Sequence, residues 1–564
     1  MDFSEQAAFS LNVLRESQFW QRIKELREDV DDDLAEMVIN TAADFASDVL
    51  APLNTIGDRE GCRLDNGQVR VPSAYHPAWA ELGANGWIGI DVPETIGGQG
   101  LPLAVQAACE TLFDRAAMAF CMLAGSTRSA TFVLDAYAEP AVKDLWGPKL
   151  SSGEWAATIC ISEADAGSDV GRIRTQAVEA DGIWRISGQK SWISFGGHDL
   201  TPRTGHMLLA RTGPAETGTR GLSLFLVPDT KDDGSANGVS VERIEEKLGL
   251  HGSPTCVLRF DDAEATLIGE LNRGLPQLFV MIERMRLLTA GQGAGQAMAA
   301  YDIASRYAAE RRQGGRPDAA PVFLTEHADV QRQLAEIASR ALSVQAFVLE
   351  LAAILDLSEI EPDASSRADY AAMAAFLLPL AKNFGGEAGF DVASRAIQVL
   401  GGAGYTQEWP VEQMLRDARI LTIFEGTTGM QALDLLHRRV WKDEARGIAV
   451  FLGYLRQEIE NTKEKHPALC DVALDIIGRF EVLTGRFSAL STDKQTAEYG
   501  ADAFLNASWA VVSAWVGLKL AQSGEPRQSA AGALRVHEAN AALTQSEARA
   551  EWQSALFKPF GVTE

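Results

Sequence analysis

The spacing of apolar residues changes along the chain and divides it into segments of different character. From about residue 5 to 150, and again from about 275 to 440, apolar residues recur every three to four positions among polar ones, which predicts amphipathic helices. From about 156 to 265, short runs rich in Ile, Val, Leu and Phe are separated by Gly, Pro and Asp, which predicts β-strands and turns. The order is therefore helices, a block of strands, and helices again.

The second helical region contains long periodic segments. We expect helices over Leu275–Arg311, Asp329–Leu355, Ala364–Leu400 and Pro410–Arg439. Small residues recur at helical spacing within the first of these, as in Gly291, Gly295 and Ala299, which predicts close helix–helix packing. A further polar, Ala-rich helical region follows from about residue 445.

These segments predict an α+β protein that is mostly α, with helices and strands in separate layers. A chain of 564 residues is too long for one core, because cores stop growing near about 250–300 residues. We expect an N-terminal helical domain over 1–155, a central antiparallel β domain over 156–270, a helical bundle over 271–440 and an additional C-terminal helical domain over 441–564.

The charge balance narrows the range of partners. The formal net charge is -26, from 51 Lys and Arg against 77 Asp and Glu. A protein that neutralises phosphates needs a basic face, so this balance argues against nucleic acid and against an anionic membrane surface. A local basic pocket for a phosphorylated ligand is still compatible with it.

The sequence shows no pattern of a disulfide framework, a metal site or an export signal. The six cysteines are scattered without a CxxC pair, and the eight histidines form no HxxxH pair, so we expect reduced thiols and no metal. The start of the chain is acidic and lacks a long apolar core, and no stretch of 18 apolar residues lacks charges. We therefore expect no signal peptide, no transmembrane helix and a cytoplasmic protein.

Two segments in the strand block carry candidate ligand contacts. Ile159–Asp169 (ICISEADAGSD) leaves a strand and enters a loop whose hydroxyls and backbone N–H groups can bind a heterocycle edge or phosphate oxygens. Gly188–Gly197 (GQKSWISFGG) places an aromatic ring and a hydroxyl on one strand, suited to a planar ligand. Taken alone, the first segment is better explained by a strand-terminal turn, and the second by a core tryptophan.

Two glycine-containing segments follow in the helical region. Glu310–Gly315 (ERRQGG) ends a helix, where arginine favours the helix dipole but also suits a pyrophosphate. Gln398–Tyr405 (QVLGGAGY) closes another helix with three glycines. A helix C-cap explains one of them, and bare backbone that approaches a ligand explains three more readily.

The last segment, Arg416–Gln431 (RDARILTIFEGTTGMQ), contains a candidate base. Glu425 follows an apolar run and precedes a Gly-Thr-Thr turn. A carboxylate in apolar surroundings has a raised pKa and becomes a useful base. An acidic residue that favours a helix N-terminus explains the same position, so this segment alone leaves both interpretations open.

In combination and in this order, the segments resemble those of the acyl-CoA dehydrogenase family, over about residues 30–440. The matching pieces are PETIGGQGLP (Pro93–Pro102), SEADAGSD (Ser162–Asp169), GQKSWIS (Gly188–Ser194), ERRQGG (Glu310–Gly315), QVLGGAGY (Gln398–Tyr405) and RDARILTIFEGTT (Arg416–Thr428). The extra C-terminal region and two segments of the strand block, Gly196–Arg211 and Gly249–Ala263, resemble the long forms. This branch includes 3-methylmercaptopropionyl-CoA dehydrogenase-like proteins and long fatty-acyl-CoA dehydrogenases.

The resemblance implies a flavoprotein that uses FAD and converts a saturated acyl-CoA to a trans-2-enoyl-CoA. It implies that Glu425 removes the α-proton while the β-hydride passes to flavin N5, with electrons leaving to electron-transferring flavoprotein from a homodimer or homotetramer. The implied FAD contacts are Ile161, Ser162, Ser168, Trp192, Ile193, Ser194, Arg311, Gln398, Gly402, Thr427 and Gly429. The implied substrate contacts are Ser168, Arg286 and Gly426.

Two other functions share this resemblance. An acyl-CoA oxidase performs the same half-reaction with oxygen as acceptor, and sequence separates the two poorly. Some proteins of this fold are nucleic-acid-binding adaptive-response flavoproteins, which would carry a basic C-terminal face that this acidic chain lacks. The sequence identifies neither the acyl group nor the role of the residues after about 445.

Overall fold

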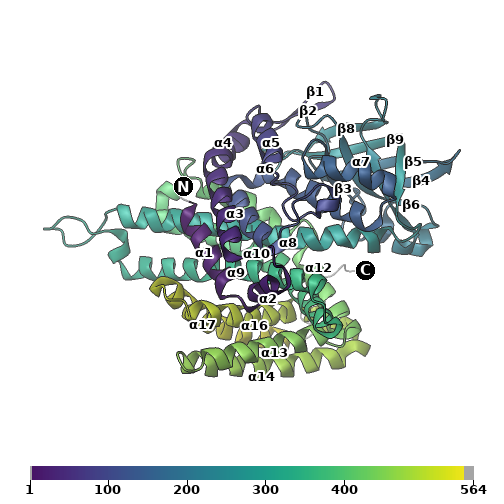
Figure 1. Cartoon of the computed structure of the whole chain (residues 1–564). Helices are drawn as coiled ribbons and strands as arrows, with labels where there is room; N and C mark the ends of the chain where they lie inside the picture. The colour runs from purple at the N-terminus through teal and green to yellow at the C-terminus, as the bar shows by residue number, and fades with distance from the viewer. Residues whose placement is uncertain (1–2, 552–564) are drawn as a thin grey trace, which may run out of the picture. The chain divides into compact units, whose positions relative to one another are not determined.

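The computed structural model describes residues 3–551, and the chain divides into two compact units (Figure 1). The first unit contains Asn40–Leu288 together with the first three residues, and the second contains Ser4–Ile39 and Thr289–Glu564. Helices α3 (Asp32–Phe45) and α8 (Gly274–Glu310) each contribute residues to both units.

The first unit begins with helices and a small hairpin. Its elements before the main sheet are η1 (Ala46–Leu50), α4 (Ala51–Glu60), β1 (Arg63–Asp65), β2 (Gln68–Arg70), α5 (Tyr75–Ala84), η2 (Glu94–Ile96), α6 (Leu103–Tyr137) and α7 (Pro140–Ser151). Helix α6 is buried along almost its whole length, and its backbone leaves the helical region once, at Ala117 (φ -156°, ψ 67°).

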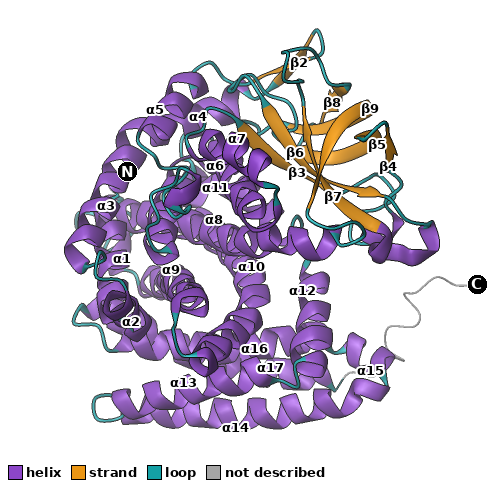
Figure 2. Ribbon diagram, turned by 45° about the vertical axis from the view of Figure 1, so that its right-hand side comes forward, coloured by secondary structure: helices purple, strands orange, loops and turns teal. Residues whose placement is uncertain are grey.

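A seven-stranded sheet forms the rest of the first unit (Figure 2). Its strands are β3 (Ala156–Cys160), β4 (Gln176–Ala180), β5 (Ile183–Ser194), β6 (Thr204–Arg211), β7 (Leu222–Pro228), β8 (Val239–Ile244) and β9 (Thr255–Ile268), with short helical turns η3 (Val170–Arg172) and η4 (Ala215–Gly221) between them. The order is β3-β6-β4-β5-β9-β7, with β8 beside β9 and a further pairing between β6 and β7. Most pairs are antiparallel as predicted, whereas β6 pairs in parallel with β3 and, at one position, with β4.

Within this sheet, both faces of β6 are buried. Met207 and Leu209 of β6 pack in a cluster that includes side chains of α6, α7 and the first turns of α8. The alternate residues Leu208 and Ala210 pack on the other face, in a cluster that includes Val69 of the β1–β2 hairpin. Because successive side chains of a strand point to opposite faces, a strand between two packed layers reads as a continuous apolar run.

The second unit is helical. Its elements are α1 (Ser4–Glu16), α2 (Gln18–Leu26), η5 (Leu324–Glu326), α9 (Ala328–Ile360), α10 (Ala364–Leu400), η6 (Gly401–Tyr405), α11 (Val411–Ala418), η7 (Arg419–Thr422), α12 (Thr428–Asp434), η8 (Leu435–Lys442), α13 (Arg446–Thr462), α14 (Pro467–Ala489), η9 (Leu490–Thr492), α15 (Lys494–Tyr499), α16 (Ala501–Ala521) and α17 (Pro526–Ala550). The predicted helix over Ala364–Leu400 has the observed bounds. The predicted single helix over Pro410–Arg439 is wrong, because positive φ angles at Glu425 and Gly426 divide it.

Small residues allow two helices of the second unit to cross closely. A Cβ atom added at Gly293 of α8 would lie 1.9 Å from the carbonyl oxygen of Gly385 of α10, and one added at Gly385 would lie 2.5 Å from Cα of Ala290. Real Cβ contacts are longer, so the observed backbone distance requires glycine on both helices. The backbones therefore cross closely at Gly293, whereas close packing through Gly291, Gly295 and Ala299 stays a prediction.

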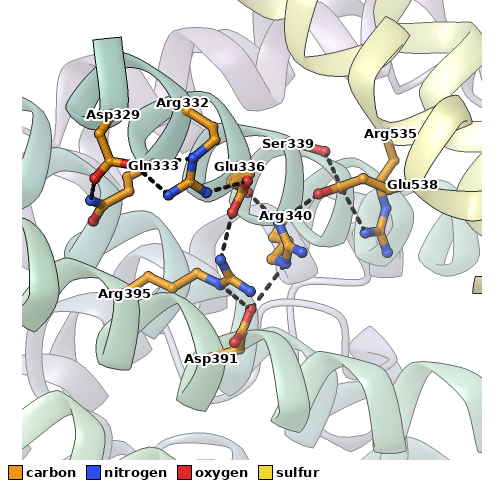
Figure 3. Close-up of polar contacts among 10 residues, drawn as sticks. All are labelled: Asp329, Arg332, Gln333, Glu336, Ser339, Arg340, Asp391, Arg395, Arg535 and Glu538. Carbon is orange, nitrogen blue, oxygen red and sulfur yellow. Dashed lines mark hydrogen bonds and ion pairs between the residues drawn. The ribbon is translucent and has the colours of Figure 1, made fainter. Parts of the chain in front are cut away.

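A network of charged side chains joins α9, α10 and α17 (Figure 3). The guanidinium of Arg340 donates to Glu538 (2.8 Å) and contacts Asp391 (3.0 Å), while Arg395 donates to Glu336 (2.6 Å). Residues of this network also line a cavity of about 490 Å³, together with the stacked rings of Phe384 and Trp509. The acidic and basic side chains of the network pair with one another, so the network links three helices and carries no net charge.

Residues 441–551 pack on the rest of the second unit. Helices α13, α14, α16 and α17 lie side by side, and both views agree on this (Figures 1 and 2). Lys519 of α16 forms an ion pair with the buried carboxylate of Glu350 on α9, with 3.0 Å between Nζ and Oε1. This region is therefore part of the packed core of the second unit.

Among residues 3–551, three helices are long and apolar enough by composition to cross a membrane, whereas the sequence predicted none. They are α6, α9 and α16. Of their most apolar windows, 94%, 83% and 83% respectively is buried inside the protein. Core packing therefore accounts for their apolar character.

All six cysteines lie among the described residues as free thiols, and five of them are buried. Burial raises the pKa of Cys62, Cys160 and Cys256 to about 12 in each case. Burial also raises the pKa of Cys109, Cys121 and Cys470.

Candidate functional site

A buried lysine supports the loop that follows β3 in the first unit. The ammonium of Lys190 on β5 donates to the carbonyl oxygen of Ile161 (2.8 Å) and to Oε1 of Glu163 (3.0 Å). Glu163 also accepts from the backbone N–H groups of Arg174 (2.8 Å) and Thr175 (3.0 Å). Burial alone would raise the pKa of Glu163, but Lys190 and these hydrogen bonds outweigh burial and hold the pKa below its usual value. The loop is thereby fixed at its first residues.

The same strand presents an exposed tryptophan. Trp192 has φ 61°, which is uncommon for a bulky residue, and lies where the pairing of β5 with β9 shifts register between Lys190 and Ile193. Trp192 is 54% exposed, whereas Ile193 is buried. Next to it, the backbone N–H of Ser191 donates to the carbonyl oxygen of Ser162 (2.9 Å), which ties the two candidate segments together. The alternative of a core tryptophan is therefore wrong.

The first unit thus brings five of its predicted contacts into two adjoining segments. Ile161 and Ser162 are half-buried on the loop, and Trp192, Ile193 and Ser194 end β5. Ser168 lies further along the loop and is exposed. The remaining predicted residue of this unit, Arg286, is buried on α8.

In the second unit, the predicted contacts from Arg311, Gln398 and Gly402 are exposed at helix ends. Arg311 follows the last residue of α8, and its backbone N–H still bonds the carbonyl oxygen of Tyr307. Gln398 lies in the last turn of α10, where its carbonyl oxygen accepts from Gly401. An added Cβ at Gly401 or Gly402 would meet no atom within 4 Å. Close packing therefore does not explain the glycines at these two positions, and the backbone there is open to a ligand.

The proposed base lies on a sharp turn between η7 and α12. Glu425 has φ 53° and the next residue, Gly426, has φ 89°. The left-handed conformation costs a non-glycine residue roughly 1–2 kcal/mol, so surrounding contacts must hold it. Glu425 is half-buried, whereas Thr427 and Gly429, the remaining predicted contacts on this turn, are exposed. The apolar residue Leu421 before the turn is fully buried and anchors its start.

Three buried side chains hold this turn. Lys382 of α10 donates its ammonium to the carbonyl oxygen of Gly426 (2.6 Å), and the side-chain amide of Gln431 donates to the same oxygen and to that of Glu425 (3.2 Å each). Asn383, next to Lys382, accepts from the hydroxyl of Thr428 (2.7 Å). The turn is therefore fixed on both sides of Glu425.

The exposed groups fit the parts of FAD within each unit. In the first, an aromatic ring on a fixed strand and the hydroxyls of Ser162 and Ser194 suit a flat polar heterocycle. In the second, the guanidinium of Arg311 and the bare backbone at Gly401 and Gly402 suit a pyrophosphate and sugar. Among residues 3–551, no group of three or more His, Cys, Asp or Glu side chains could hold a metal ion.

Sequence reasoning missed the residues that support these segments. Lys190 and Lys382 are fully buried, and each donates to a backbone carbonyl of a candidate segment. A signal for Lys382 exists, since it interrupts the apolar run AAMAAFLLPLA with a charge that must be compensated. Lys190 and Glu163 lie within quoted motifs, but their spacing in sequence does not reveal that they pair.

Comparison with known proteins identifies the family. Models of the N-terminal, middle and C-terminal domains of acyl-CoA dehydrogenases match residues 32–154, 158–263 and 272–440 in that order. The chain is 38% identical over 440 residues to 3-methylmercaptopropionyl-CoA dehydrogenase of Ruegeria pomeroyi, which covers 76% of this chain and 74% of the relative. It is 32% identical over 492 residues to the broad-specificity linear acyl-CoA dehydrogenase FadE5 of Mycobacterium tuberculosis, covering 82% of this chain and 80% of the relative.

The fold comparison extends to the C-terminal region. The structure of ACDH-11 of Caenorhabditis elegans in complex with C11-CoA matches with a TM-score of 0.79 at 21% identity, covering 96% of this chain and 94% of that one. The helices after residue 440 therefore belong to a known form of the fold. The predicted fold class and family are confirmed: the chain belongs to the acyl-CoA dehydrogenase family of flavin-dependent oxidoreductases.

Proposed function

We propose that this chain binds FAD and an acyl-CoA thioester and converts the thioester to a trans-2-enoyl-CoA, with Glu425 as the base. The observation that carries the proposal is the turn at Glu425. A half-buried carboxylate on a left-handed residue is held by three buried side chains, although a relaxed backbone would cost less. Strain maintained in this way is typical of residues whose position matters for function.

For this reaction the protein must hold the substrate in position and supply a proton acceptor. The thioester acidifies the α-carbon, so one carboxylate suffices to remove the α-proton. Bound FAD would accept the hydride that leaves the β-carbon. A donor at the thioester oxygen, for which the backbone N–H of Glu425 is suited, would stabilise the charge that develops there. Ser168, Arg286 and Gly426 would contact the substrate.

The FAD contacts we propose are those that the family resemblance implies. They are Ile161, Ser162, Ser168, Trp192, Ile193, Ser194, Arg311, Gln398, Gly402, Thr427 and Gly429. The hydroxyls and the exposed ring suit the flavin ring system, and the arginine and glycines suit the phosphates and sugars.

Electrons would leave to electron-transferring flavoprotein, in the cytoplasm, from a homodimer or homotetramer. An oxidase that passes electrons to oxygen is the alternative, and peroxide yield in air separates the two. Stoichiometric peroxide during turnover would exclude the dehydrogenase.

The acyl group calls for a direct survey. The named relatives act on 3-methylmercaptopropionyl-CoA and on linear acyl-CoA thioesters, so short, long and sulfur-containing acyl chains form the panel. Loss of flavin absorbance under anaerobic conditions scores each thioester, and the rate constants rank them.

The test of the base is Glu425→Gln. This variant should bind FAD normally and lose flavin reduction by acyl-CoA by about 10²–10⁴-fold, the usual contribution of a general base. Glu444→Gln is the matched control, because Glu444 also has a positive φ (51°) but is exposed and lies outside the matched motifs. Flavin reduction in Glu425→Gln at the rate of the control would exclude Glu425 as the base.

A further inference from the structure

Lys382 is a charged residue at a buried position, where keeping a charge costs free energy. Its side chain is fully buried on α10, and its ammonium is 2.6 Å from the carbonyl oxygen of Gly426 and 5.9 Å from the ring centroid of Phe424. These two residues flank Glu425. A buried ammonium loses much of its hydration, so its retention at this position needs a compensating role.

The carbonyl oxygen of Gly426 does not need a charged donor to be satisfied. It also accepts from the side-chain amide of Gln431 at 3.2 Å, and the neighbouring Thr428 is held by Asn383. Among these three anchors only Lys382 adds a positive charge, and it forms the shortest hydrogen bond. The acidic side chain on the turn is that of Glu425. A positive charge, and not only a hydrogen bond, is what distinguishes this anchor.

We propose that Lys382 is a positioning residue for the base: its ammonium fixes the Glu425–Gly426 turn and supplies a positive charge that favours the ionised form of Glu425. The second part rests on the proposed function, whereas the first concerns the turn alone. A nearby positive charge lowers the pKa of a carboxylate, which keeps more of it ionised at a given pH.

A purely structural role is the competing explanation, and the chain offers a matched control for it. Lys519 of α16 is also buried, with 13% of its side chain exposed, and its ammonium lies 5.9 Å from the ring centroid of Trp515. It pairs with Glu350 and Glu458, neither of which lies in a motif segment. Lys519→Met therefore removes a buried ammonium without changing the turn.

The variants separate the hydrogen bond from the charge. Lys382→Met removes both, whereas Lys382→Gln keeps a donor of similar reach without charge and covers the case in which Lys382→Met does not fold. In Lys382→Met, amide hydrogen exchange over residues 423–431 should accelerate about tenfold or more relative to wild type and to Lys519→Met. Lys382→Gln should keep most of the protection.

The rate of flavin reduction by acyl-CoA reports the charge. In both Lys382 variants, the acidic limb of the rate–pH profile should move to higher pH, because removal of a nearby positive charge raises the pKa of a carboxylate. The maximal rate in Lys382→Met should also fall by about 10–100-fold, because the carboxylate is less well placed. Lys519→Met should retain the wild-type profile.

Three different results would each overturn a different part of the proposal for Lys382. Exchange over residues 423–431 in Lys382→Met that equals that in Lys519→Met would exclude the positioning role. An unchanged pH profile in both Lys382 variants would exclude the charge role. If no acyl-CoA reduces the wild-type flavin, the proposed function fails, and the exchange measurement still decides whether Lys382 holds the turn.

Discussion

The ion pair between Lys190 and Glu163 joins β5 to the loop after β3, and its removal should destabilise the protein by an amount that depends on pH. Lys190→Met replaces the ammonium by an apolar group of similar length. It removes the contacts to Glu163 (3.0 Å) and to the carbonyl oxygen of Ile161 (2.8 Å). Breaking a buried ion pair costs about 3–5 kcal/mol. Glu163 keeps two backbone donors, so we expect the lower end, about 3 kcal/mol, at neutral pH.

The sign of the pH dependence follows from Glu163. In the wild type its folded pKa is lowered, so its stabilising contribution is complete above the unfolded pKa of about 4.3 and is lost as the pH falls through the folded pKa. In Lys190→Met, burial is no longer outweighed by the ammonium, so the carboxylate is costly when ionised and neutralises readily on acidification. The difference in stability between the two proteins should therefore shrink between about pH 7 and about pH 4.5.

The assay is chemical denaturation of the wild type and the variant across that pH range, with retained FAD measured in parallel. Lys231→Met is the control, since Lys231 pairs with Glu264 on the same sheet but both side chains are about a third exposed. Such a pair contributes about 0–1 kcal/mol. A stability difference for Lys190→Met that is independent of pH, or no larger than that of Lys231→Met, would refute the reasoning.

Two further substitutions test packing in the second unit by thermal denaturation. Gly293→Ala would place a Cβ atom 1.9 Å from the carbonyl oxygen of Gly385, so it should lower the free energy of unfolding by about 1–3 kcal/mol. The control is Gly453→Ala on α13, whose Cβ atom would meet nothing within 4 Å and which should raise stability slightly. Equal melting temperatures of the two variants would contradict the close crossing. Arg340→Ala should lower the melting temperature more than Arg332→Ala, because Arg340 links three helices while the Arg332 side chain is 56% exposed, and the reverse order would contradict a linking role.

The fold was predictable from sequence where local pattern determines structure. Helical periodicity located α10 at its observed ends, and apolar runs between turn residues located the sheet. The prediction failed over Pro410–Arg439, where helical propensity continues across Glu425 but the backbone does not. That turn is held by Lys382, a residue 43 positions earlier in the chain, and no local pattern contains such a contact.

The candidate site was predictable to a lesser extent. Motifs located Trp192 and Glu425, but each motif alone favoured a core tryptophan or a helix-terminal glutamate. Exposure of the ring and a positive φ at both residues favour a functional role over these. The supporting lysines came from the structure alone, because burial of an ammonium depends on tertiary packing. The roles of the individual contacts stay predictions.

The state of the cysteines has a practical consequence. Thiol reagents attack the thiolate, and at neutral pH a thiol with a pKa near 12 is ionised in only about one molecule in 10⁵. Burial also raises the pKa of the other three thiols, so all six native thiols should react slowly with maleimides. A single cysteine introduced on an exposed loop would then carry a fluorophore or spin label without prior removal of the six natural ones, so motion of the Glu425 turn can be followed in an otherwise unmodified chain.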